Sequence, residues 1–257
     1  MVIFIIKALK GQKLFNFIQE PYIPHRAAVT FGLESANVVG YVQLDTAETD
    51  FIVGCNFVST DGVTEGIKFS DIKGEFEDYD NIQVASIVDG KITFTDYYYF
   101  SAEGGMVTDT GWYADDMVTF VGNETLKLGS AIWFGSGSEK AVTLSGQIYD
   151  GNFTHQFTES QEMVCSAFPT AFNPNKATWV GLEDYDNIQT SSVVNGKIVF
   201  TDYYYFSAEG GMVAETGWYL DDMVTMAEEI TLPGQGFWLT FEGNPSDVSL
   251  IEKSPLK

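Results

Sequence analysis

The stretch TDYYYFSAEGGMVTDTGWYADDMVT at residues 95–119 returns almost unchanged at residues 201–225. The two copies differ only at Thr108/Ala214, Asp109/Glu215 and Ala114/Leu220. A shorter stretch, DYDNIQ, precedes each copy with the same spacing, at residues 78–83 and 184–189. The chain therefore carries an internal duplication, and we interpret the rest of the sequence as two copies of one unit.

Each copy contains two β-prone runs around a turn dipeptide, Asp89-Gly90 in the first copy and Asn195-Gly196 in the second. These dipeptides are favoured in two-residue type I′ hairpins because both central residues need a positive φ. Such a turn fixes the strand register. We predict that Val88 opposes Lys91, Ile87 opposes Ile92, Ala85 opposes Phe94, Gln83 opposes Asp96, and Gln189 opposes Asp202.

Alternation along residues 91–100 predicts which face of the hairpin meets the core. We expect Ile92, Phe94, Asp96, Tyr98 and Phe100 to point inward and the residues between them to point outward. A buried carboxylate needs hydrogen-bond partners. We therefore predict buried polar pairs that hold the register, with a catalytic or metal-binding carboxylate as the alternative; the pairs are Gln83 with Asp96 and Gln189 with Asp202.

The rest of the chain consists of short β-prone runs separated by turns, without sustained helical periodicity. This pattern predicts an all-β fold made of two tandem homologous antiparallel β-sandwich or barrel repeats. We place the first repeat at residues 37–149 and the second at residues 150–257. The copies differ most at residues 168–175, FPTAFNPN, a loop without a counterpart in the first copy.

Residues 1–36 differ in character from the remainder of the chain. A short apolar segment with basic residues leads to AAVTFGLESA at residues 27–36, which reads like the end of a secretory signal and its small-residue cleavage site. We expect either an atypical export signal or a disordered extension here. The longest apolar run, residues 2–6, is far shorter than the roughly 20 residues of a membrane span, so no span is expected in the mature body.

The net charge of −23 over 257 residues makes the surface strongly acidic. Such a surface repels phosphates instead of releasing their counterions, so we expect no nucleic-acid partner. Cations, cationic partners and neutral sugars remain compatible with it, and so does a purely solubilising role.

The two cysteines, Cys55 and Cys165, lie in similar apolar settings upstream of the repeated block. We interpret them as equivalent positions of the two copies. They predict either two buried thiols on strands or, in an oxidising compartment, a disulfide between the copies.

Motifs for catalysis and metal binding are few. The only histidines, His25 and His155, are not repeated, so a histidine-based triad has no support, and we expect no enzyme. A glycoside hydrolase is the alternative, if the acidic pairs faced a second carboxylate across a cleft; the pairs are Asp115-Asp116 and Asp221-Asp222. The DxDN segments resemble the start of a calcium loop but lack its later glycine and glutamate. We expect solvated acidic turns and no cofactor, with calcium as the alternative, at Asp78, Asp80, Asp184 and Asp186.

Three short stretches carry a resemblance: SANVVGY at residues 35–41, the Trp-Tyr-acidic turn, and LPGQGFWL at residues 232–239. They resemble a loose group of uncharacterised secreted bacterial tandem β-repeat proteins, whose mature chains open with a similar stretch and whose units each contain Gly-Gln-Gly-Phe-Trp. The resemblance implies export and a β-repeat build, and it implies no catalytic residues. The first copy departs from it, with GSAIW at residues 129–133.

These observations favour two classes of function. The first is a secreted or cell-surface structural protein of an envelope layer, fibre or matrix, which associates with itself or with envelope components. The second is a bivalent carbohydrate-binding module whose aromatic rings stack on glycans while aspartates bond hydroxyls, although packing in the core is the plainer role for such rings. Its candidate residues are Trp112, Tyr113, Asp115, Asp116, Trp218, Tyr219, Asp221 and Asp222.

Overall fold

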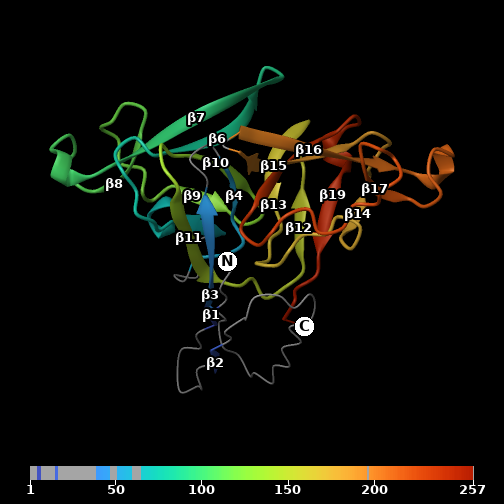
Figure 1. The fold of residues 1–257 in the computed structure, drawn as a ribbon, viewed down its shortest axis with the longest axis horizontal. Helices are drawn as coiled ribbons and strands as arrows, with labels where there is room; N and C mark the ends of the chain where they lie inside the picture. The colour runs from blue at the N-terminus through green and yellow to red at the C-terminus, as the bar shows by residue number, and fades with distance from the viewer. Residues whose placement is uncertain are drawn as a thin grey trace.

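The structure, a computed structural model, describes residues 5–6, 15–16, 39–46, 51–59, 65–195 and 197–256. Within these ranges the protein has no α-helix and consists of antiparallel sheets joined by turns and short 3-10 helices (Figure 1). The predicted all-β class is confirmed. Apart from the short pair β1 (Ile5–Ile6) and β2 (Phe15–Asn16), the predicted export segment at residues 1–36 lies outside the described residues.

Two five-stranded sheets dominate the fold. The N-terminal sheet has the order β4, β10, β6, β7, β8, and the C-terminal sheet has the order β13, β18, β15, β16, β17. Corresponding strands therefore occupy corresponding places in the two sheets. The N-terminal strands are β4 (Phe51–Gly54), β6 (Asn81–Val88), β7 (Lys91–Phe100), β8 (Gly111–Ala114) and β10 (Ala131–Gly135). The C-terminal strands are β13 (Gln161–Cys165), β15 (Asn187–Val194), β16 (Lys197–Phe206), β17 (Gly217–Leu220) and β18 (Gly236–Thr240).

Smaller ladders cover these sheets. They are β3 (Val39–Thr46) with β11 (Lys140–Gln147), β5 (Gly66–Lys68) with β9 (Thr125–Lys127), and β19 (Ser249–Glu252) between β12 (Phe153–Gln156) and β14 (Thr178–Val180). The 3-10 helices are η1 (Phe69–Asp71), η2 (Ala102–Gly104), η3 (Ala208–Gly210) and η4 (Pro245–Asp247).

The main apolar cores lie between these layers. The N-terminal core joins Ile82 and Phe134 of the large sheet to Leu44 of β3 and Leu144 of β11. The C-terminal core joins residues of β15 and β18 to Phe157 and to Leu250 of β19. Each five-stranded sheet thus buries one face against a smaller ladder, as amphipathic antiparallel sheets do.

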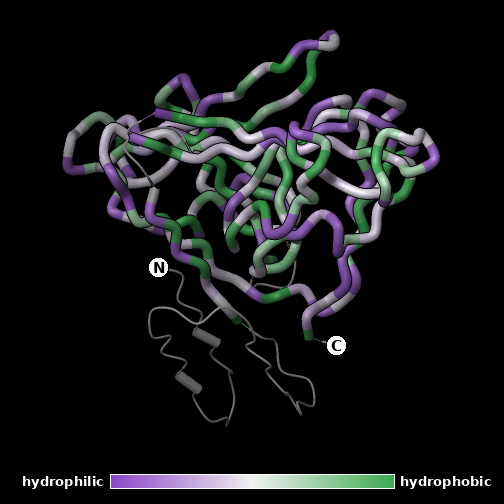
Figure 2. Tube along the Cα trace, turned by 45° about the vertical axis from the view of Figure 1, so that its right-hand side comes forward, coloured by the Kyte–Doolittle hydropathy of each residue, from purple (hydrophilic) through white to green (hydrophobic). Residues whose placement is uncertain are grey.

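Both hairpins have the predicted register. Val88 opposes Lys91, Gln83 opposes Asp96, and Gln189 opposes Asp202. Asp89 and Gly90 have φ values of 51° and 72°, as a type I′ turn requires. Gly196 lies outside the described residues. The hairpin of β6 and β7 projects from the body (Figures 1 and 2), because β10 pairs with residues 81–83 and β8 with residues 97–100 only.

The predicted core face of the hairpin is wrong. Tyr97 and Tyr99, predicted to point outward, pack against the N-terminal core. Ile92 and Phe94, predicted to point inward, are 40% and 44% exposed. Both faces of β7 carry aromatic residues, so alternation alone did not identify the buried face. Tyr97 and Tyr99 lie on the core side. Phe100 is buried, but between the rings of Tyr79 and Tyr113 on the opposite face.

The two halves contact each other in a reciprocal way. The ring of Phe94 lies 6.2 Å from that of Trp238, and the ring of Trp133 lies 6.4 Å from that of Phe200. The backbone N–H of Gly54 donates to Gly234 over 2.7 Å, and that of Cys165 donates to Gly129 over 2.9 Å. Two apolar clusters also cross between the halves. One contains Ile52, Ala131 and Met163, and the other contains Leu128, Ala167 and Phe168.

The two cysteines are not equivalent positions, contrary to the prediction. Gly54 pairs with Ala131, and Cys165 pairs with Gly236, so the structural counterpart of Cys165 is Gly54. A Cβ at Gly54 would lie 2.3 Å from the Cβ of Cys165, which explains why glycine stands there. Because the two cysteines lie in similar apolar segments, the sequence did not reveal that Cys165 aligns with Gly54, one residue before Cys55.

Candidate functional site

The aromatic residues proposed to stack on sugars are core residues. Trp112 is 2% exposed, Tyr113 5%, Trp218 1% and Tyr219 4%. Trp112 packs edge to face against Phe76 and Tyr99, and Trp218 packs against Tyr205 and Trp179. The hydroxyl groups of the two tyrosines donate to backbone carbonyls four residues earlier. Their rings cannot stack on a glycan, so this part of the carbohydrate hypothesis is wrong.

The acidic pairs beside these rings are exposed, and their second members organise turns. The carboxylate of Asp116 accepts hydrogen bonds from the N–H groups of Val118 and Thr119 and from the Thr119 hydroxyl. Asp222 makes the same three contacts with Val224 and Thr225. These hydrogen bonds favour the ionised form and lower the pKa of both carboxyls. Asp115 and Asp221 are exposed neighbours of these turns.

The candidate calcium ligands also face backbone N–H groups. Asp78 accepts from Ser101, and Asp184 accepts from Ser207. Asp80 accepts from Glu77 and from the Ser136 hydroxyl, and its carboxylate lies 3.6 Å from the Lys140 ammonium. Asp186 accepts from Glu183 and Glu242, and burial raises the pKa of its carboxyl. In the part of the chain that the structure describes, no group of three or more acids, histidines or cysteines is placed to hold a metal ion.

The predicted polar pairs are hydrogen-bonded, but they are only half-buried. The Gln83 amide donates to Asp96 over 2.6 Å, and the Gln189 amide donates to Asp202 over 2.9 Å. Asp202 has a second donor, the Asn187 amide at 3.3 Å. Each pair lies on the face away from the main core, where β10 or β18 places a tryptophan opposite the glutamine. Their geometry agrees with a role in register.

Both cysteines are buried free thiols. The Cys55 thiol donates to the carbonyls of Phe57 and Leu126, and the Cys165 thiol donates to those of Cys55 and Ser130. Burial raises the pKa of Cys55 to about 11 and that of Cys165 well above its usual value. The thiols are therefore weak nucleophiles.

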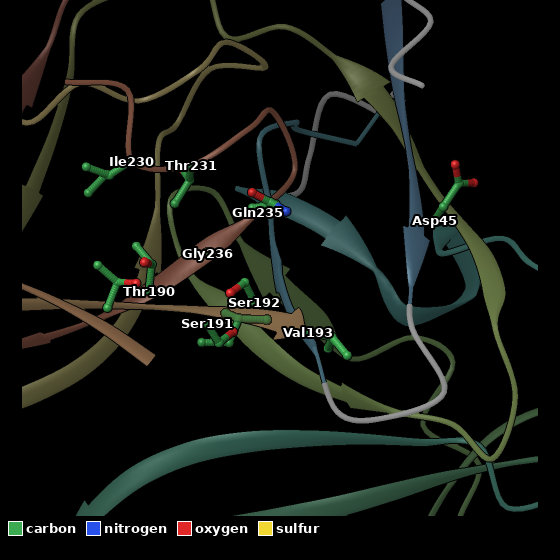
Figure 3. Close-up of a pocket in the computed structure, with 11 residues that line it drawn as sticks. Asp45, Thr190, Ser191, Ser192, Val193, Ile230, Thr231, Gln235 and Gly236 are labelled. Atoms are coloured by element: carbon green, nitrogen blue, oxygen red, sulfur yellow. The ribbon is translucent and has the colours of Figure 1, made fainter. Parts of the chain in front are cut away.

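A polar pocket of about 360 Å³ lies between the halves (Figure 3). Hydroxyls of β15 and β16 line one side, and Figure 3 shows Asp45 of β3 apart from them. The amide oxygen of Gln235 in the pocket wall accepts from the Leu232 N–H over 2.9 Å. Among the described residues that line the pocket, Asp45 is the one that carries a carboxylate. The hydroxyl-bearing residues are Thr190, Ser191, Ser192, Thr201 and Thr231.

At the corresponding places of the two halves the residues differ in size and polarity. Ile52 pairs with Trp133 in β10, and Met163 pairs with Trp238 in β18, so Ile52 and Met163 are counterparts. Ala85 and Ser191 are also counterparts, opposite Phe94 and Phe200. Ile52, Met163 and Ala85 belong to one apolar cluster, and Ile52, which is shorter than Met163, also lines the pocket together with the polar Ser191.

A second hollow, of about 270 Å³, lies beside Trp112 and is lined by the rings of Phe76, Tyr99, Trp112 and Phe120. The sequence did not predict this hollow, because its walls come from separate segments, residues 70–76, 99, 110–112 and 120–122. In the C-terminal half the Asn175 side chain, from the loop at residues 168–175, bonds the backbone of Trp218 and Ala227.

Comparisons with protein-family models, curated proteins and solved structures find no match to this chain. Among the described residues there is no helix with the length and apolar character needed to cross a membrane.

Proposed function

We propose that the chain is a non-catalytic structural protein, secreted or at the cell surface, that assembles with further copies of itself into a fibre or layer. We also propose that its halves, residues 37–149 and 150–257, are tandem homologous β-sandwich units. The sequence repeat and the matching strand orders support the second proposal. The resemblance to secreted β-repeat proteins supports export.

The observation that carries the assembly proposal is an apolar patch presented twice. We define the N-terminal end patch as Tyr79, Met106, Met117, Val118 and Phe120, which are 40% to 80% exposed. The C-terminal end patch consists of Tyr185, Met212, Met223 and Val224, which are 41% to 80% exposed. In both patches the tyrosine hydroxyl contacts the first methionine sulfur, at 3.8 Å and 3.5 Å. Exposed apolar groups gathered in one place are typical of interaction surfaces.

The placement of the patches favours open assembly. Apart from Tyr79 and Tyr185, which lie in the turns before β6 and β15, their residues belong to the loops around β8 and β17, which lie toward opposite ends of the longest axis (Figure 1). If one end patch binds the end patch of another copy, each chain joins two neighbours and the assembly continues as a line. A single patch would give only dimers. A duplicated chain is therefore suited to a fibre in a way that a single unit is not.

The charge of the protein sets the conditions for this assembly. Exposed acids stand beside both patches, Asp115 and Asp116 at one end and Asp221 and Asp222 at the other. With a net charge of −23, copies repel each other at low salt. At about 0.15 M salt the screening length falls to about 8 Å, so we expect assembly to increase with ionic strength.

The test measures particle mass by sedimentation velocity and light scattering over a range of protein and salt concentrations. Val118→Lys and Val224→Lys each place a charge in one end patch, at residues that are both 80% exposed, so the fold should be unaffected. We expect oligomers of the parent, dimers of either single variant, and monomers of the double variant.

The matched control is Val88→Lys with Val194→Lys, which alters exposed valines at the hairpin ends. It should assemble like the parent. A parent that stays monomeric at all salt concentrations, or a Val118/Val224 double variant that still assembles, would show that the end patches do not join copies.

A further inference from the structure

Within the described residues, the exposed methionines are confined to the two end patches. Each patch contributes two of them: Met106, Met117, Met212 and Met223. The other methionines in the described ranges are less accessible, since Met163 is buried and Met226 is half-buried. A reagent that attacks thioethers in the folded protein therefore meets the end patches first.

The backbone presents one methionine of each patch in a strained conformation. Met117 and Met223 have φ values of 56° and 55°, in the left-handed region that favours glycine or asparagine. The turn around Met117 is held by the Asp116 carboxylate, which accepts from the N–H groups of Val118 and Thr119, and an identical turn holds Met223. Strained residues of this kind gather at functional sites. A methionine in both turns favours a role for its side chain at the surface.

The other methionine of each patch has a tyrosine hydroxyl beside its sulfur. The hydroxyl of Tyr79 donates to Met106 over 3.8 Å, and that of Tyr185 donates to Met212 over 3.5 Å. Both tyrosines also have a φ of 76°. The sulfur keeps a lone pair that does not accept from the hydroxyl, and this lone pair is open to an oxidant. The contact thus places an exposed, reactive sulfur at the same point of both patches.

The cysteines do not compete for such an oxidant. Cys55 and Cys165 are buried, and their thiols donate to backbone carbonyls. Burial raises the pKa of both thiols. Because the thiolate is the form that reacts with peroxides, these thiols are poor targets. Among the described residues, the sulfur atoms that are open to oxidation are concentrated at the ends of the molecule.

We propose that the four exposed methionines form an oxidation site, and that their conversion to methionine sulfoxide by a peroxide blocks end-to-end assembly. In each step a sulfur lone pair attacks one oxygen of hydrogen peroxide and the O–O bond breaks. The other oxygen leaves as hydroxide, which takes the proton from the new S–OH group and becomes water. The sulfur is oxidised and the peroxide is reduced. The effect on assembly rests on the proposed function, whereas the oxidation site does not.

Oxidation changes what the end patches can bury. It converts a flexible apolar side chain into a polar one, and burying the sulfoxide oxygen between two copies without a donor costs free energy. The carboxylates beside the patches supply acceptors only; they are Asp115, Asp116, Asp221 and Asp222. Copies that are already joined cover their methionines, so the oxidant acts on free ends and stops further growth.

The experiment treats the full chain with hydrogen peroxide at low salt, where copies repel each other, for increasing times. Mass spectrometry of proteolytic peptides measures the oxygen gained at each methionine. We expect the four end-patch methionines to gain an oxygen atom each before Met163 and Met226 react. Treated and untreated protein are then compared by sedimentation velocity at about 0.15 M salt. We expect oligomers of the untreated protein and monomers of the treated protein.

Three variants locate the effect. The first combines Met106→Leu, Met117→Leu, Met212→Leu and Met223→Leu, which keeps the surface apolar, so it should assemble before and after peroxide. Met226→Leu, the matched control at a half-buried methionine, should lose assembly after peroxide as the parent does. Met117→Gln with Met223→Gln makes both turns polar and should stay monomeric without an oxidant. Methionine sulfoxide reductases, with a thiol as reductant, should restore assembly of the oxidised parent.

The possible failures are distinguishable. Oxidation of Met163 or Met226 as fast as the end-patch methionines would overturn the oxidation site. Selective oxidation without loss of oligomers would overturn its effect on assembly, and so would loss of oligomers when the leucine variant is treated with peroxide. An untreated parent that stays monomeric would overturn assembly itself, while the peptide masses would still decide whether the oxidation site exists.

Discussion

The surroundings of Trp112 and Trp218 show how one sequence block acquires two environments. The block around each tryptophan is almost identical, and each tryptophan is paired in the same register with a tyrosine. The Asn175 side chain bonds the backbone of Trp218, whereas a hollow of about 270 Å³ lies beside Trp112. The strand orders of the two halves match, whereas the side chains that surround each tryptophan differ.

The largest expected effect comes from truncating the two tryptophans. Trp112→Ala and Trp218→Ala should each lower the free energy of unfolding by about 3–5 kcal/mol, the usual range for a large buried side chain. The loss should be greater for Trp218, because it is packed between Trp179 and Tyr205, while Trp112 already borders a hollow. Urea titrations of both variants measure this, and equal losses would mean that the hollow does not weaken packing at Trp112.

How much of the fold the sequence predicts depends on how far apart along the chain the interacting residues are. The hairpin registers followed from local turn chemistry at Asp89-Gly90, and the all-β class followed from periodicity. The core face of β7 did not follow, because both faces carry aromatic residues and only the smaller ladders decide which face is covered. The burial of Trp112 and the equivalence of Gly54 with Cys165 depend on packing between segments that are distant in the sequence.

The candidate sites also divide into those fixed by a local turn and those formed by residues that are distant in the sequence. The pairs Gln83–Asp96 and Gln189–Asp202 were predictable because facing residues in a two-residue hairpin are fixed by the turn. The pocket between the halves was not, since it results from exchanges at positions that meet only in three dimensions, such as Ile52 and Ser191.

Removing the glutamine amide from each polar pair should have a smaller effect on stability, and the effect should differ between the two halves. Gln83→Leu removes the amide that donates to Asp96, whereas Gln189→Leu leaves Asp202 with Asn187. Hydrogen bonds to charged groups are worth about 1.5–3 kcal/mol, and half-burial favours the lower end. We expect Gln83→Leu to cost about 1.5 kcal/mol and Gln189→Leu less. Adding Asn187→Ala to Gln189→Leu should bring the two halves level in thermal or urea unfolding.

Filling the pocket between the halves should make the molecule more symmetric and slightly more stable. Ile52→Met with Ser191→Ala introduces the residues of Met163 and Ala85 at their counterparts. Cavity filling of this kind commonly adds about 0.5–2 kcal/mol. The carbon Cγ2 of Ile52 lies close to Gly236, so the longer side chain must extend into the pocket. A variant less stable than the parent would show that the hydroxyl lining contributes more than the apolar contacts.

The smallest expected effect is a difference in pH dependence between two aspartates of the C-terminal half. Burial raises the pKa of Asp186, with the nearby Glu183 and Glu242 acting in the same direction, whereas hydrogen bonds from Thr225 and Val224 lower the pKa of Asp222. A raised pKa means that the folded state holds a proton that the unfolded state releases. The stability due to Asp186 is therefore present below the usual carboxyl pKa of about 3.9 and is lost as the pH rises through the raised value.

For Asp222 the sign is opposite, because its ionised form is the one favoured by folding. Its contribution is present above the usual carboxyl pKa and is lost as the pH falls through the lowered value. The destabilisation caused by Asp186→Asn should therefore shrink as the pH is raised from about 4 toward neutrality, while that caused by Asp222→Asn should grow as the pH is raised from strongly acid values to about 4. Urea unfolding of both variants and the parent across this range gives the two slopes. If Asp186→Asn showed the same slope as Asp222→Asn, the Asp186 carboxylate would be ionised in the folded protein, and the backbone N–H groups of Glu183 and Glu242 would outweigh its burial.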